Sequence, residues 1–164
     1  MSAEPTVGVR LSVLDRLMEG SGRLASPTSS SWAASPDEFK ATFLRDLDWL
    51  LNTRRVPDPT PDRYRELQHS VYYYGLPDVT SLSADSGDAH QRLARDIEEC
   101  IRIFEPRLTS ARVFLAAAGE AGERRVRFVI DGVLRMDPQT ERIVLDTVLE
   151  TPTGKFTVAG EGDA

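Results

Sequence analysis

The sequence predicts an α+β fold in which N-terminal helices pack on a small antiparallel sheet of three to four strands. Three observations support this class. Apolar residues recur every three to four positions as far as residue 104, and then alternate with polar residues from residue 111 onward. The segments that join the alternating stretches are short and contain Gly, Asp and Pro, as in a meander. A chain of 164 residues can bury one core but not two.

The N-terminal part of the chain is expected to hold one short helix and a linker. Residues 12–19 read SVLDRLME and place Leu14, Leu17 and Met18 on one helical face. Residues 20–34 are rich in Ser, Gly, Pro and Ala, a composition typical of a flexible linker. A helix this short does not fold alone in water, so it either packs on its own domain or docks into the groove of a partner.

The first long helix is predicted to begin after Ser35. This residue is a good N-cap, Pro36 suits the first helical position, and Glu38 can complete a capping box. Apolar residues from position 39 to position 51 then follow at helical spacing. Asn52 is a plausible stop, and the three prolines that follow forbid continuation of the helix.

Two further helical segments are predicted before the sheet. Residues 62–74 are compatible with a shorter helix that ends at Gly75, but the three tyrosines at 72–74 suit a strand equally well. Residues 87–104 carry the most regular pattern in the chain, with apolar positions at alternating steps of three and four. Pro106 ends this second long helix.

Period-two alternation predicts strands over residues 111–117, 125–135 and 142–150, with a short fourth strand over 155–158. One face of this sheet would pack against the helices, and the other face is only half polar. Either a tail or a partner covers the second face, and the free edges of the sheet can accept a strand from another chain. The valines on the second face are Val129, Val133, Val144 and Val148.

Composition excludes several function classes. A net charge of −6 argues against a general nucleic-acid binder. Of the 20 basic residues 18 are Arg, the cation best suited to protein interfaces. The single cysteine, Cys100, is expected to be buried and inert, and two histidines do not predict a metal site or a cofactor. No secretory signal and no apolar stretch near ~20 residues is present, so a soluble, cytoplasmic protein is expected.

A catalytic site is not predicted. Glu105 is the one acidic residue whose sequence neighbours are mostly apolar. Arg107 follows two positions later, and a nearby cation lowers the pKa of a carboxyl group. A glycoside hydrolase needs one carboxyl group of raised pKa and a second one nearby. The pair therefore either locks the junction between helix and sheet or is presented to a partner.

Four segments of the chain resemble the TssE family of type VI secretion baseplate subunits. They are IRIFEPRL (101–108), FLRDLDWLLNTRR (43–55), SVYYYGLPD (70–78) and LSVLDRL (11–17). That family is similar to the wedge proteins of contractile phage tails, which are often given a lysozyme-like label. The resemblance implies a non-enzymatic protein without a cofactor, located in the cytoplasm as part of a membrane-docked apparatus. It also implies a baseplate wedge domain over residues 35–158, followed by a disordered tail at 159–164.

The resemblance also implies partners and contact residues. The wedge partners would be TssF, TssG and TssK. A sheet edge would template polymerisation of the sheath proteins TssB and TssC. The protein would neither bind nucleic acid nor insert into the membrane. The alternative is a peptidoglycan hydrolase, a lysozyme-like muramidase. We expect loss of either charge of the Glu105–Arg107 pair to weaken assembly rather than folding. The residues implied in partner binding are Glu105, Pro106 and Arg107, then Asn52, Thr53 and Arg54, and in the N-terminal docking helix (1–19) Leu14, Leu17 and Met18.

Overall fold

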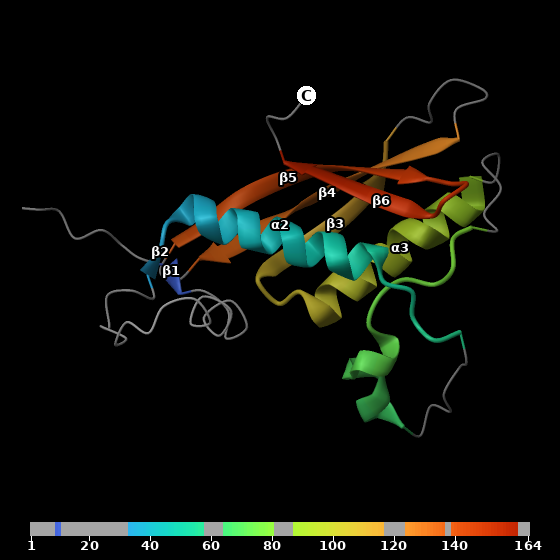
Figure 1. The fold of residues 1–164 in the computed structure, drawn as a ribbon, viewed down its shortest axis with the longest axis horizontal. Helices are drawn as coiled ribbons and strands as arrows, with labels where there is room; N and C mark the ends of the chain where they lie inside the picture. The colour runs from blue at the N-terminus through green and yellow to red at the C-terminus, as the bar shows by residue number, and fades with distance from the viewer. Residues whose placement is uncertain are drawn as a thin grey trace, which may run out of the picture.

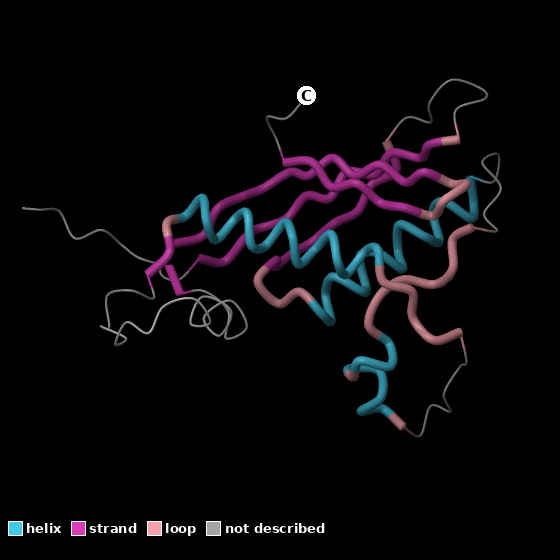
Figure 2. The backbone as a smooth tube through the Cα atoms, viewed as in Figure 1, coloured by secondary structure: helices cyan, strands magenta, loops and turns pink. Residues whose placement is uncertain are grey.

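Two long helices, α2 (Pro36–Asn52) and α3 (Gly87–Phe104), lie on one face of a four-stranded antiparallel sheet (Figures 1 and 2). This arrangement confirms the predicted α+β class. The computed structural model describes residues 9–10, 33–57, 64–80, 87–116, 124–136 and 139–160. Helix α2 packs against the β6 side of the sheet, and α3 packs against β3 at the other side.

The sheet is a meander in the order β3-β4-β5-β6, with every neighbouring pair antiparallel. The predicted strands occur in the predicted order, but they are longer. The first begins at Leu108 instead of 111, because Leu108 already pairs with Leu134 of the next strand. The strands are β3 (Leu108–Leu115), β4 (Arg125–Met136), β5 (Gln139–Glu150) and β6 (Lys155–Gly160).

A second, two-stranded ladder joins β1 (Val9–Arg10) to β2 (Ala33–Ala34), and this ladder contacts α2. The last two residues of the predicted linker are therefore paired strand residues. The predicted helix over 12–19, with its three apolar residues, lies outside the described residues, as do residues 161–164.

Helix α2 begins and ends as its sequence predicts. Ser35 Oγ accepts a hydrogen bond from the Glu38 amide at 3.2 Å, and the Glu38 carboxylate accepts one from the Ser35 amide at 2.8 Å. These two bonds form a capping box, which satisfies two amides that a helix start leaves free. At the other end, the Thr53 amide and hydroxyl both donate to the Trp49 carbonyl.

The prediction of one helix over 62–74 is wrong, and so is the alternative of a strand. The chain forms two short 3₁₀ helices, η1 (Arg65–His69) and η2 (Val71–Tyr73), which project away from the body of the molecule (Figure 1). Ser70 separates them, because its hydroxyl donates to the Leu67 carbonyl and accepts from the Tyr72 amide.

One core fills the space between the helices and the inner face of the sheet. Cys100 is buried in it, as predicted, and lies on the apolar stripe of α3. The largest of the almost completely buried side chains described are each worth about 1.5–3 kcal/mol of transfer free energy. These are Phe43, Leu47, Leu50, Leu51, Leu76, Ile97, Ile101, Phe128, Ile130, Leu134, Leu149 and Phe156.

Candidate partner-binding site

The Glu105–Pro106–Arg107 corner joins α3 to β3. Arg107 Nε and Nη2 donate to the two carboxylate oxygens of Glu105, each at 2.6 Å, so the pair is bidentate. The Glu105 carboxylate also accepts from the Arg107 amide at 3.3 Å. Glu105 is only 4% exposed, whereas Pro106 is exposed to solvent. The corner therefore buries its acid and presents its proline.

Helix α2 supplies a third member of this cluster, which the sequence analysis did not single out. Asp46 accepts from Arg107 Nη2 at 2.8 Å, and the Arg107 guanidinium lies over the Phe43 ring, 5.6 Å from its centroid. Desolvation lowers the pKa of Arg107, but hydrogen bonds and negative charge from Glu105 and Asp46 outweigh it and raise this pKa above its ordinary value. Arg107 is a permanent cation that ties α2 to the junction.

The burial of Glu105 changes what its removal should do. Loss of this carboxylate would leave the partly buried Arg107 with Asp46 as its remaining acidic partner, and an uncompensated buried charge destabilises a fold. Glu105 thus has a structural contact of its own, and the expectation that loss of either charge weakens assembly rather than folding stays a prediction. We expect loss of Glu105 to destabilise the fold and, by displacing Arg107 and Pro106, to weaken contacts with a partner as well.

The Asn52–Arg54 segment is a clamp at the end of α2. The Asn52 side-chain amide donates to the Phe156 carbonyl at 3.1 Å and accepts from the Phe156 amide at 2.9 Å. It thus imitates a neighbouring strand at one residue of the edge strand β6. The Thr53 carbonyl accepts from the Leu76 amide at 2.9 Å, which fixes the loop that follows the 3₁₀ helices.

Arg54 extends the clamp to the turn between β5 and β6. Its Nη2 donates to the Gly154 carbonyl, and its Nη1 donates to the Leu51 carbonyl at 3.2 Å. Gly154 has a φ of +66°, and a Cβ there would lie 2.8 Å from Arg54 Nη2. The two motifs that the sequence analysis singled out both fix α2, one near its middle and one at its C-terminal end.

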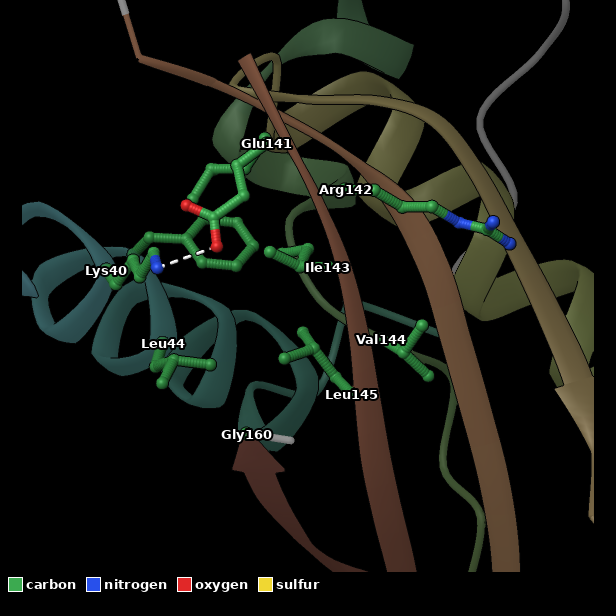
Figure 3. A pocket seen from close by; sticks show the side chains of 10 residues that line it. Lys40, Leu44, Glu141, Arg142, Ile143, Val144, Leu145 and Gly160 are labelled. Atoms are coloured by element: carbon green, nitrogen blue, oxygen red, sulfur yellow. Dashed lines mark hydrogen bonds and ion pairs between the residues drawn. The ribbon is translucent and has the colours of Figure 1, made fainter. Parts of the chain in front are cut away.

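A groove lies between α2 and β5 (Figure 3), with a volume of about 240 Å³. Leu44 of α2 and Ile143 and Leu145 of β5 face one another across it. The Lys40 ammonium binds the Glu141 carboxylate at 2.8 Å beside the groove. Phe43 also lines the groove, so the ring under Arg107 connects the corner to it.

The same groove runs along a stretch of β5 that has no strand neighbour on its groove side among the described residues. Strand β6 ends at Gly160, opposite Leu145, so within the described residues β5 has a strand neighbour on one side only before that point. The alternation of the ladder directs the backbone N–H and C=O groups of Thr140, Arg142 and Val144 away from β4. These backbone groups can form hydrogen bonds with an added strand, and the groove can receive its apolar side chains.

The opposite edge of the sheet is less open. The Val113 amide, which points away from β4, donates to the Glu98 carboxylate of α3 at 3.1 Å. A bulge also interrupts β3 between Thr109 and Arg112, where Ser110 has a φ of 54°. Side chains and bulges of this kind are common protections of an edge strand. The β5 side is therefore the better candidate for strand addition.

The described residues do not assemble a hydrolytic or metal site around Glu105. Both of its carboxylate oxygens accept hydrogen bonds from Arg107 and the residue is only 4% exposed, which does not fit a general acid that must reach a substrate. No group of three or more metal-ligating side chains occurs in the described ranges. Among the same residues, no helix is both long enough and apolar enough to cross a membrane.

Comparison with known proteins gives a match to a family model. Residues 37–139, more than half of the chain, match the family model described as baseplate wedge protein gp25. The matched region runs from the first turn of α2 to the start of β5, and it contains both the clamp and the corner. No curated protein and no solved structure matches the chain significantly.

Proposed function

The chain belongs to the gp25 family of baseplate wedge proteins, a structural family, and from this premise we propose that it is a type VI secretion baseplate subunit on which the contractile sheath begins to polymerise. The observation that carries the proposal is the stretch of β5 before Leu145, which lies beside the groove and pairs with no second strand within the described residues. A strand of a sheath subunit added there would gain main-chain hydrogen bonds from β5 and place its apolar side chains against α2.

The corner contributes to this function in two ways. Pro106 and the partly exposed Arg107 form a rigid surface for a baseplate or sheath partner, since Glu105 and Asp46 hold the guanidinium in place. The Arg107 guanidinium also packs over the Phe43 ring, and Phe43 lines the groove that receives the strand. Asn52, Thr53 and Arg54 keep α2 at the correct distance from β6.

The partners follow from the proposed apparatus. TssF, TssG and TssK form the wedge, and the N-terminal segment with Leu14, Leu17 and Met18 docks on it. TssB and TssC form the sheath that begins on β5. The protein acts in the cytoplasm, within an apparatus docked on the membrane.

Val144→Pro tests the strand-addition site directly. The Val144 amide faces the uncovered side, so proline removes a donor for the incoming strand without removing a bond between β4 and β5. We expect wedge complexes with this variant to assemble normally but to nucleate at most about one tenth of the wild-type number of sheaths, because one main-chain bond and the fit of the strand are lost. Sheath number is counted by electron microscopy of TssB and TssC with purified wedges.

Val144→Thr is the matched control, because it keeps the amide and the β-branched shape at the same position. It should nucleate sheaths as the wild type does. Normal nucleation by Val144→Pro, with the variant folded and present in the wedge, would reject this edge as the template.

A further inference from the structure

We propose that the sheet face opposite the helices is a docking surface for an acidic amphipathic helix of a protein partner. We call this surface the outer face; it consists of the side chains of β3–β6 that point away from α2 and α3. The outer face shares Arg142 and Val144 with the groove beside β5. Strand addition uses the main chain of β5, whereas helix docking uses side chains, so each proposal has its own test.

The centre of the outer face is apolar and exposed. Phe114 is 55% exposed and pairs across the β3–β4 ladder with Val129. Val144 and Val148 lie on the next strand, on either side of the residue opposite Val129. These valines are half-buried, and none of them belongs to the core cluster or to the side chains packed on it.

The size of this apolar patch fits one helix. Neighbouring strands are about 4.8 Å apart, so the patch spans about 10 Å from β3 to β5. A helix with its side chains has a diameter of about 10–12 Å. The inner face of the same sheet is covered by helices, and a second helical layer is the usual way to cover the other apolar face of a sheet.

The charge of the outer face selects an acidic partner. The described strand residues place six cations and three carboxylates on this face, a net charge of +3 on a chain whose net charge is −6. Neither Arg127 nor Arg135 has a side-chain carboxylate within ion-pair distance among the described residues. The cations are Arg112, Arg125, Arg127, Arg135, Arg142 and Lys155, and the carboxylates are Asp131, Asp146 and Glu150.

One carboxylate at the centre of the outer face disfavours nucleic acids and anionic membranes as partners. Asp146 is exposed, lies opposite Val129 and stands between Val144 and Val148. It opposes the approach of a phosphate backbone or an anionic headgroup to the centre of the patch. A helix can satisfy it with one Lys or Ser within its apolar stripe, while its flanking Asp and Glu residues meet the arginines at the rim.

The test uses the full-length, ¹⁵N-labelled chain and synthetic helical peptides of about 18 residues. One peptide has a Leu stripe flanked by Glu, a second has the same stripe flanked by Lys, and a third has the acidic composition with the stripe scrambled. We expect saturable binding of the first peptide, at least about tenfold tighter than that of the other two. Its chemical-shift changes should concentrate on β3, β4 and β5.

Two variants of the outer face make the test specific. Phe114→Ser should weaken binding of the acidic peptide at least about fivefold, and Arg127→Glu should do the same, since each removes one component of the surface. Both side chains are exposed, so neither change should unfold the domain. Val71→Ser is the matched control, because Val71 is also exposed but lies on η2, outside the outer face.

Several results would overturn the proposal. Equal binding of the acidic and basic peptides would show that charge does not select the partner, and an unchanged affinity in both Phe114→Ser and Arg127→Glu would place the site elsewhere. Displacement of the peptide by duplex DNA or by anionic vesicles at lower concentration would indicate another class of partner. Binding that occurs only after deletion of residues 1–32 would show that the chain covers this face itself.

Discussion

Arg107 shows how one side chain can hold several elements together. Its guanidinium binds Glu105, which lies in the same corner between α3 and β3, and Asp46 on α2. It also lies over the rings of Phe39 and Phe43. Arginine suits this position because its planar fork forms bidentate bonds and its face stacks on aromatic rings. Lysine would supply the charge without the fork, so the two residues are not equivalent here.

Glu105→Ala should destabilise the fold by about 2–4 kcal/mol, because it leaves the partly buried Arg107 with one acidic partner. Urea denaturation of the purified protein measures this change. Glu99→Ala is the control, since Glu99 forms an exposed ion pair with Arg102 and should cost less than about 0.5 kcal/mol. An unchanged stability with lost sheath assembly would mean that the pair acts only on a partner.

Cys100 should make the stability of the fold depend on alkaline pH. Burial raises the pKa of its thiol from 9.0 to about 11, and the buried thiol donates a hydrogen bond to the Gly75 carbonyl. Below pH 9 the thiol is protonated in both states, and between pH 9 and 11 only the unfolded state ionises. The free energy of unfolding should therefore fall by about 2–3 kcal/mol over that interval.

Cys100→Ala isolates this effect from other titrating groups. The difference in unfolding free energy between wild type and variant, measured by urea denaturation, should shrink by about 2–3 kcal/mol as the pH rises from 8 to 11. A constant difference across this range would contradict the buried, inert thiol.

At the scale of elements, α2 is fixed at two points by side chains from distant parts of the sequence. Arg107 fixes its middle through Asp46, and the Asn52 amide fixes its end to β6. The Asn52 contact also occupies the free edge of β6 at Phe156. The clamp lies near the start of β6, away from the stretch of β5 that lacks a second strand neighbour in the part of the chain that the structure describes.

Asn52→Ala should free one end of β6 and cost about 1–3 kcal/mol, because the buried backbone groups of Phe156 lose both partners. Hydrogen exchange should accelerate at β6 amides and remain unchanged at amides shared by β3 and β4. Gln91→Ala, at an exposed position of α3, is the control and should alter neither region. Uniform acceleration over the whole sheet would indicate global destabilisation instead of a local clamp.

The periodicity of the sequence was sufficient for the long elements. Capping residues located the start of α2, and the change of period located the sheet. The segment 62–74 was misjudged because its apolar residues do not form a buried stripe, and Ser70 competes for the backbone. The contact of Asn52 with Phe156 was not predictable, since 104 residues separate the two and pattern rules describe only local neighbours. Asp46 was overlooked because its position within a helix looks like that of any solvated charge.

At the scale of the whole molecule, one folded domain carries both the core and two candidate docking surfaces. The buried hydrophobic residues described extend from Phe39 to Phe156, all within the predicted domain of residues 35–158. The uncovered β5 edge and the outer face belong to this domain as well. None of the described core residues lies before residue 20, so docking of that segment on a partner would remove none of them from the core.

Deletion of residues 1–19 should leave the domain folded and abolish its binding to the wedge. The core cluster described loses no member, so the melting temperature should fall by no more than about 4 °C, the effect of losing the short β1–β2 ladder. Binding should be lost because the deletion removes Leu14, Leu17 and Met18, the apolar face proposed to dock on TssF and TssG. Co-purification with tagged TssF and TssG measures this binding, and the triple substitution of these three residues by Ser controls for chain length. Undiminished co-purification of both variants would assign wedge binding to the folded domain, and the outer face would then be the first surface to test.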